Sequence, residues 1–166
     1  MATTYISKQI TAGKQPRVLP EGFICTQINT FLNSTAFVIN DLVNMVQLEA
    51  NPTVLGNGPT IKNVLVDMPA MDSSTGFSWV VGDSTTANKY ITTSTVGRSS
   101  AGGVVAMNAQ GGLGYQPFLS DFGAFGTYTA VSLQVYTVVL KVTAAATGTP
   151  TTGNTITMAV DYTYDP

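Results

Sequence analysis

The sequence predicts an all-β fold, a two-sheet antiparallel sandwich of jelly-roll type with an extended N-terminal arm. From Gly22 onward, apolar side chains recur at every second position, which is the period of a β-strand. About eight such segments follow one another within the length of one domain, separated by connections rich in Gly, Pro and Asn. Helix signals are nearly absent, because residues 41–48, which have near-helical spacing, are rich in β-branched side chains.

Residues 1–20 are predicted to be the arm, and residues 21–166 the sandwich domain. The arm lacks sustained periodicity and carries Lys8, Lys14 and Arg17, three of the seven basic residues of the chain. Two interpretations stay open: a frayed terminus, or a tether that becomes ordered on an acidic partner surface.

The expected strands follow from composition and alternation, taken in chain order. Residues 23–31 are β-branched and aromatic, residues 39–48 lead into the tight-turn pair Asn57-Gly58, and residues 61–68 resume a strand. Residues 77–81 place Trp79 on one face with its apolar neighbours, residues 90–96 show Thr-rich alternation, and residues 104–107 are short.

Residues 131–142 form a long strand that becomes continuously apolar near its end, and residues 155–164 alternate most clearly. The turn-rich segment 147–154 predicts that these last two strands pair antiparallel. Residues 111–126 are expected to form a long loop with Tyr115, Phe118, Phe122 and Phe125.

Composition argues against an enzyme. The chain has no His and only 10% charged residues, so Ser-His-Asp and Cys-His arrangements are impossible. One cysteine, Cys25, allows neither a zinc site built on Cys and His nor an intrachain disulfide framework, and its place in a strand favours a buried small hydrophobe over a nucleophile. We therefore expect no catalytic residue, cofactor or metal.

The same composition bears on partners and location. A net charge of −2 attracts neither nucleic acid nor an anionic membrane. Residues 1–22 lack the apolar stretch of a signal peptide, so we expect none there, and we expect a protein made in the cytoplasm. Gln134 and Lys141 interrupt the longest apolar stretch, so we expect no membrane span.

Three carboxylates in the middle third, Asp67, Asp72 and Asp83, are candidates for a catalytic pair of the glycosidase kind, together with Glu21 and Glu49 in loops. Asp72 or Asp83 could also hold Ca²⁺ together with loop carbonyls. Asx turns explain Asp72 and Asp83 without chemistry, and we favour that interpretation. The aromatic residues Trp79, Tyr90 and Tyr115 are candidates for a sugar-stacking platform. For Trp79 core packing is favoured, while the loop around Tyr115 fits packing on another subunit as well as local packing.

The low charge also concerns the surface, which must consist largely of Thr, Ser, Asn and Gly. Such a surface loses water at little cost and suits burial in an assembly. A Thr-rich β protein would look similar whatever its function, because Thr is favoured on the solvated face of a strand.

Five segments, residues 40–46, 61–68, 81–91, 111–115 and 160–163, resemble segments of small virion proteins of tailed bacteriophages, in particular capsid decoration (cement) and head structural proteins. In this group a Val-Gly-Asp segment with small polar residues and an aromatic is followed by a Gly-Tyr stretch and a Thr-rich last strand.

This resemblance implies a β-sandwich on the outer surface of the expanded head, where it bridges and stabilises major capsid protein subunits. It implies a homotrimer, or alternatively a homodimer, and no enzymatic activity. The candidate capsid contacts are Lys8, Lys14, Arg17, Tyr115, Phe118 and Phe122. Alternatives are another virion component, such as a head fibre base or tail protein, and a carbohydrate-binding β-sandwich module.

Overall fold

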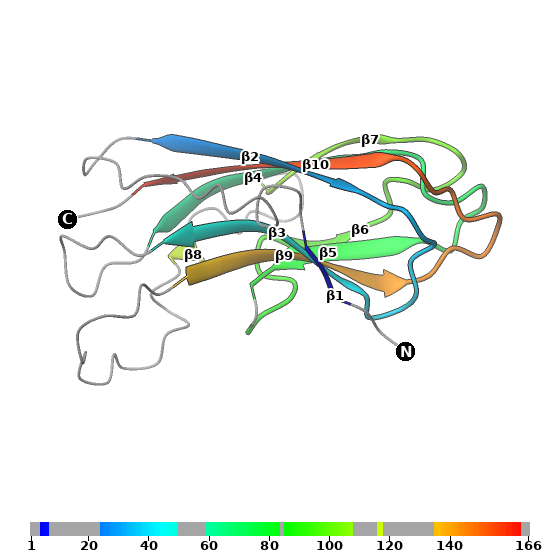
Figure 1. Cartoon of the computed structure of the whole chain (residues 1–166), viewed down its shortest axis with the longest axis horizontal. Helices are drawn as coiled ribbons and strands as arrows, with labels where there is room; N and C mark the ends of the chain where they lie inside the picture. Colours follow the sequence, from blue (N-terminus) through cyan, green and yellow to red (C-terminus); the bar gives the residue numbers. More distant parts are fainter. Residues whose placement is uncertain are drawn as a thin grey trace.

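Two β-sheets face each other and enclose one apolar core, as the computed structural model shows (Figure 1). The structure describes residues 4–6, 24–49, 59–83, 85–107, 116–117 and 135–163. No α-helix occurs among these residues, and the described strands account for the all-β class that the alternation predicts.

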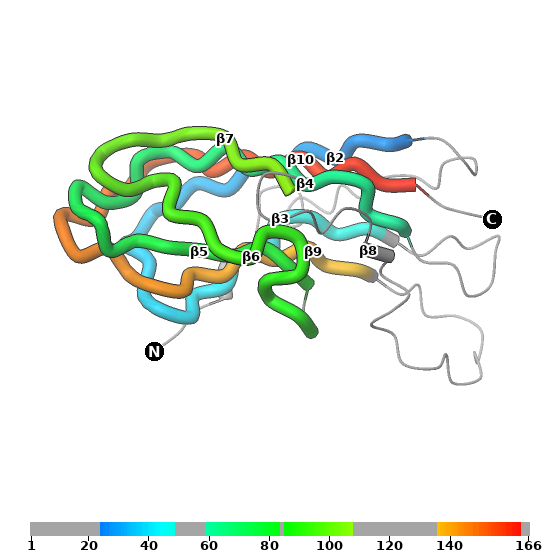
Figure 2. The backbone as a smooth tube through the Cα atoms, turned by 180° about the vertical axis from the view of Figure 1, so that it is seen from behind, coloured from blue at the N-terminus to red at the C-terminus, as the bar shows by residue number. Residues whose placement is uncertain are grey.

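The first sheet contains five strands. In order across the sheet they are β1 (Thr4–Ile6), β3 (Leu42–Glu49), β9 (Val135–Ala144), β5 (Ser78–Gly82) and β6 (Ile91–Ser94). The second sheet has the order β2 (Cys25–Leu32), β10 (Thr155–Thr163), β4 (Thr60–Met68) and β7 (Gly103–Ala106), and β8 (Gln116–Pro117) pairs with the start of β4. Figure 2 shows the same two layers from behind.

The strand order is that of a jelly roll, as the sequence predicts. Without β1 and β8, the remaining eight of the ten strands fall into two four-stranded sheets, β2-β10-β4-β7 and β3-β9-β5-β6. In each sheet one of the last two strands, β9 or β10, lies between two earlier strands, because the chain folds back on itself as two Greek keys. All pairings except that of β1 with β3 are antiparallel.

The prediction that the last two strands pair with each other is wrong. β9 lies between β3 and β5 in the first sheet, whereas β10 lies between β2 and β4 in the second. The connection of residues 145–154 is long enough to cross from one sheet to the other, and the Asp72 carboxylate accepts hydrogen bonds from the N–H groups of Thr147 and Gly148 within it.

Part of the segment predicted as an arm belongs to a sheet. Thr4–Ile6 form β1 and run parallel to Leu42–Asn44 at the edge of β3. The other residues of the arm lie outside the described residues, and so does the predicted turn pair Asn57-Gly58. The strands before and after Asn57-Gly58, β3 and β4, belong to different sheets.

Period-two alternation builds the core. In β10 the side chains of Ile156, Met158, Val160 and Tyr162 are buried, and the residues between them face outward. A register shift between Asp161 and Tyr162 places one extra β4 residue in the pairing. A polar contact also joins the sheets, since the buried Asn29 side chain on β2 donates a hydrogen bond to the Met45 carbonyl on β3.

Candidate functional site

The six side chains that the sequence singles out as capsid contacts lie outside the described residues. They are Lys8, Lys14, Arg17, Tyr115, Phe118 and Phe122. The structure therefore neither brings them together nor separates them, and the candidate site is built from other residues. No helix among the described residues is long and apolar enough to cross a membrane.

The candidate carboxylates do not form one centre. Asp67 is exposed on β4, whereas Asp72 and Asp83 are buried and bound to backbone N–H groups of their own loops. Within the described ranges, no group of three or more Cys, Asp or Glu residues could hold a metal ion. The Asx-turn interpretation of Asp72 and Asp83 is confirmed by these bonds.

Asp72 organises the loops at one end of the sandwich. Its two carboxylate oxygens accept hydrogen bonds from the N–H groups of Ser74, Gly76, Phe77, Thr147 and Gly148, at 2.9–3.1 Å. Burial by itself raises the pKa of Asp72, but the backbone donors outweigh it and lower the pKa to about 2. The ionised carboxylate thus ties the segment after β4 to the crossing segment between β9 and β10.

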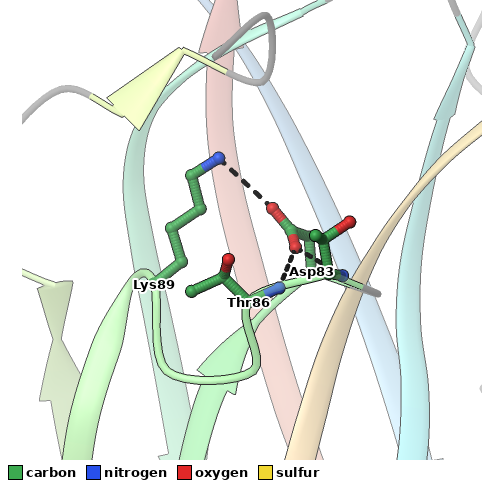
Figure 3. Close-up of polar contacts among 4 residues, drawn as sticks. Asp83, Thr86 and Lys89 are labelled. Carbon is green, nitrogen blue, oxygen red and sulfur yellow. Dashed lines mark hydrogen bonds and ion pairs between the residues drawn. The ribbon is translucent and has the colours of Figure 1, made fainter. Parts of the chain in front are cut away.

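Asp83 organises the turn between β5 and β6 (Figure 3). One oxygen accepts the N–H groups of Thr85 and Thr86 at 2.8 and 2.6 Å, and the other lies 3.2 Å from Lys89 Nζ. The Asp83 and Lys89 side chains are both buried. The Lys89 ammonium also lies 5.8 Å from the centre of the Tyr90 ring, within range of a cation–π contact.

The aromatic residues on the strands belong to the core. Trp79 and Tyr90 are fully buried, and the Trp79 indole Nε1 donates a hydrogen bond of 2.8 Å to the Val96 carbonyl. The core interpretation of Trp79 is thus confirmed, and neither side chain can stack on a sugar from solution. Tyr115, the third member of the candidate platform, lies outside the described residues.

Cys25 is buried on the inner side of β2, as expected of a small apolar side chain. Burial raises the pKa of its thiol, which lowers the fraction of reactive thiolate. Cys25 therefore has the environment of a core residue.

The outer surface of the second sheet carries four of the six large exposed apolar side chains among the described residues. On β2 and just before it, Ile24, Ile28 and Leu32 are 70%, 61% and 57% exposed, and Val104 on β7 is 66% exposed. Strand register places Ile28 beside Ala159, Ala159 beside Leu65, and Leu65 beside Ala106, so an apolar row crosses all four strands. We call this surface the outer face of the second sheet.

A polar row lies next to the apolar one. The Thr26 hydroxyl donates to Asp161 Oδ1 at 2.6 Å, and Asn63 Nδ2 donates to Asp161 Oδ2 at 3.4 Å. These three residues lie side by side on β2, β10 and β4. The carboxylate is therefore already bound within the chain, and uncharged side chains dominate the outer face around it.

Sequence reasoning missed this surface. Residues 23–31 were expected to form a strand, but their pattern does not say which side faces the core, because polar residues occur on both. The signal that could have revealed it is the repeat of large apolar residues at positions 24, 28 and 32, four residues apart.

These features define a class: a jelly-roll sandwich whose buried carboxylates and strand aromatics serve its own structure, and whose second sheet has a largely uncharged outer face that carries exposed apolar side chains and two carboxylates, Asp161 and the exposed Asp67. Comparison with solved structures agrees with the fold of this class. A chain in the capsid of Ralstonia phage GP4 matches with a TM-score of 0.67 and 18% identity, over 98% of this chain and 99% of that one. A chain in the capsid asymmetric unit of cyanophage Pam1 matches with a TM-score of 0.61 and 17% identity, over 93% and 96%.

At these identities the likeness concerns the fold, and it confirms at that level the resemblance to phage head proteins. No protein-family model matches the chain, and no curated protein matches it in sequence.

Proposed function

We propose that this protein is a structural component of a tailed-phage virion that decorates the outer surface of the expanded capsid and bridges major capsid protein subunits. One observation carries the proposal: two chains of phage capsids share the fold over nearly their whole lengths. A match over whole chains supports the same kind of protein better than a shared motif would, since it requires the same strand order throughout.

The outer face of the second sheet supports a role in assembly. Large exposed apolar patches on a folded domain mark surfaces that other molecules cover. Ile24, Ile28 and Val104 lie on such a surface, with few charges to desolvate. Contacts of this kind gain strength from symmetry, because the same weak contact is repeated around the shell.

Within this proposal, the basic residues Lys8, Lys14 and Arg17 meet acidic capsid surface, and Tyr115, Phe118 and Phe122 supply apolar contacts. The partner is the major capsid protein, and neither nucleic acid nor membrane takes part. Because β1 pairs with β3, deleting the whole arm would also remove a strand. Charge substitutions are therefore the sharper test of the arm.

The experiment mixes the purified protein with expanded heads that lack it, and separately with isolated capsid subunits, and measures occupancy by sedimentation and electron microscopy. We expect binding to expanded heads only. The triple variant Lys8→Gln, Lys14→Gln, Arg17→Gln should bind roughly tenfold more weakly at low salt, because rim charges act through screened attraction. Lys141→Gln, which changes one half-buried charge on β9, serves as the control.

Full occupancy by the triple variant would contradict the role of the arm. Failure of the unaltered protein to bind any head would contradict the decoration role itself. Density for the protein at the fibre base or on the tail would place it with other virion components instead.

A further inference from the structure

The outer edge of β2 lacks the features that usually protect an edge strand. Natural edge strands carry Lys, Pro or a bulge that prevents pairing with another chain. β2 is eight residues long, contains no charged residue and no proline, and pairs with β10 without a register shift. In the part of the chain that the structure describes, no strand pairs with its other edge.

Backbone alternation shows which residues of β2 face that edge. Just after β2, the Asn33 N–H donates to the Asn154 carbonyl at 3.0 Å, continuing the register of β2 with β10. In an antiparallel pair every second residue bonds to the same neighbour, so the odd-numbered residues of β2 bond to β10. The even-numbered residues therefore direct their N–H and C=O groups toward the open edge.

The side chains of the even-numbered residues lie on the outer face, and their residue types form a palindrome. From one end to the other they are Ile24, Thr26, Ile28, Thr30 and Leu32. At equal distances on either side of Ile28 the residues are of the same kind: Thr26 corresponds to Thr30, and Ile24 corresponds to Leu32.

We propose that β2 pairs antiparallel with β2 of a second copy of this chain, about a two-fold axis at Ile28. This register places Ile28 opposite Ile28, Thr26 opposite Thr30, and Ile24 opposite Leu32 of the second copy. Apolar pairs and threonine pairs across antiparallel strands stabilise a sheet. A shift by two residues would place Ile28 opposite a threonine, so the palindrome also selects the register.

Charge and hydrogen bonding fit a second copy. No charged side chain lies on β2, so two copies meet without like charges in the contact. The closest carboxylate in register, Asp161, lies one strand further in and already accepts the Thr26 hydroxyl. Thr30 N–H donates to Asn29 Oδ1 at 3.0 Å in the single chain, and on pairing it would donate to the Thr26 carbonyl of the second copy.

The resulting dimer joins the second sheets of two copies into one continuous sheet. It brings six large apolar side chains, three from each copy, into one band on the outer face. A two-fold contact of this kind closes on itself and gives dimers rather than rings or filaments. It needs no capsid, so its test is independent of the decoration role.

The first experiment measures the mass of the full chain by sedimentation over a range of concentrations. We expect a reversible association of the 17.4 kDa chain to twice its mass. Ile28→Lys places two ammonium groups opposite each other and should raise the dimer dissociation constant roughly tenfold or more. Ile39→Lys, which changes another exposed isoleucine outside the strands, should leave the constant unchanged.

The second experiment tests the axis itself by oxidation. Ile28→Cys should form a disulfide-linked dimer, because the two sulfurs face each other across paired strands whose Cα atoms lie about 5.5 Å apart. Thr26→Cys should not, because its own copy lies four residues away along the strand. The double variant Thr26→Cys, Thr30→Cys should cross-link again. The unaltered chain, with its single buried Cys25, is the control.

Three outcomes would overturn the proposal: a trimer, equal cross-linking of Ile28→Cys and Thr26→Cys, or a monomer at all concentrations. If the monomer binds capsids and Ile28→Lys alone weakens that binding, the β2 edge serves the capsid protein rather than a second copy. None of these outcomes bears on the fold or on the decoration role, each of which has its own test.

Discussion

Lys89 Nζ lies 3.2 Å from Asp83 Oδ2, and the two side chains are only 5% and 4% exposed. The pair closes the turn between β5 and β6, where the same aspartate also holds the Thr85 and Thr86 N–H groups. A chain with few charges thus buries two of them in its own structure. A buried ion pair is costly to break on one side, because the remaining charge keeps no partner of opposite sign.

Asp83→Asn is expected to lower the free energy of unfolding by about 3–5 kcal/mol, since it removes the carboxylate charge that lies 3.2 Å from the buried Lys89 ammonium. The double variant Asp83→Asn, Lys89→Met should lose less than the sum of the single losses. Urea unfolding of the four proteins measures this cycle. Losses that add to within about 0.5 kcal/mol would show that the two charges are not coupled.

Gly82→Ala is expected to destabilise the chain by about 1–3 kcal/mol through overpacking. An added Cβ at Gly82 would lie 1.9 Å from the Thr86 carbonyl oxygen, so the turn that carries Asp83 would have to move. The matched control is Gly103→Ala on β7, where the nearest atom is a Val96 side-chain carbon at 3.4 Å. Equal melting temperatures for both variants would contradict the close approach.

Acid is expected to weaken the loop end of the sandwich through Asp72. The pKa of Asp72 in the fold is about 2, below its ordinary value of 3.8. Its stabilisation is therefore fully present above about pH 4 and is lost as the pH falls toward 2. Asp72→Asn should lower the melting temperature at pH 7 and flatten this acid dependence. Asp67→Asn removes the same charge at an exposed position, and it should change neither the melting temperature at pH 7 nor the acid dependence.

Alkali is expected to weaken the fold through Tyr162. Burial, and secondarily the nearby Cys25 thiolate, raise the pKa of Tyr162 from 10.0 to about 12. In that window the unfolded chain loses a proton that the folded chain keeps, so stability falls as the pH rises from 10 to 12. Tyr162→Phe keeps the ring and should remove this part of the alkaline loss. Identical pH profiles for the two proteins would contradict a buried phenol.

Trp79→Phe is expected to lower the free energy of unfolding by roughly 1–3 kcal/mol, because it leaves a void and a carbonyl of Val96 without its indole donor. Trp79 is the one tryptophan of the chain, so its fluorescence reports this environment directly. Emission should shift to longer wavelength on unfolding and should not change with added glycans. A saturable glycan response would revive the carbohydrate-binding interpretation.

The strands were predictable where one face is clearly apolar. Residues 61–68 and 155–164 were expected as strands, and β4 and β10 cover nearly the same residues. β3 begins later than expected because residues 38–41 form a turn, in which Asn40 has a φ of 69° and the Asp41 carboxylate accepts the Val38 N–H. Such a turn depends on local backbone geometry, which alternation does not report.

Strand partners and the outer face were not predictable in the same way. The β9–β10 crossing depends on Asp72, whose bonds to Thr147 and Gly148 span about half the chain. The sidedness of β2 depends on Asn29, a polar residue that faces the core because its amide reaches the Met45 carbonyl on the other sheet. Hydrophobicity alone does not decide which face of β2 is buried, because each face carries both apolar and polar residues.

The central place of β10 has a consequence for how the chain reaches its fold. β10 follows every other described strand in the sequence, yet it lies between β2 and β4 and pairs with both. Until residues 155–163 have left the ribosome, β2 and β4 have no common neighbour, so the second sheet is incomplete. Folding of the second sheet must therefore follow synthesis of this segment, and a chain cut short before Thr155 should be insoluble or degraded. Only chains translated through residue 163 can therefore complete the second sheet.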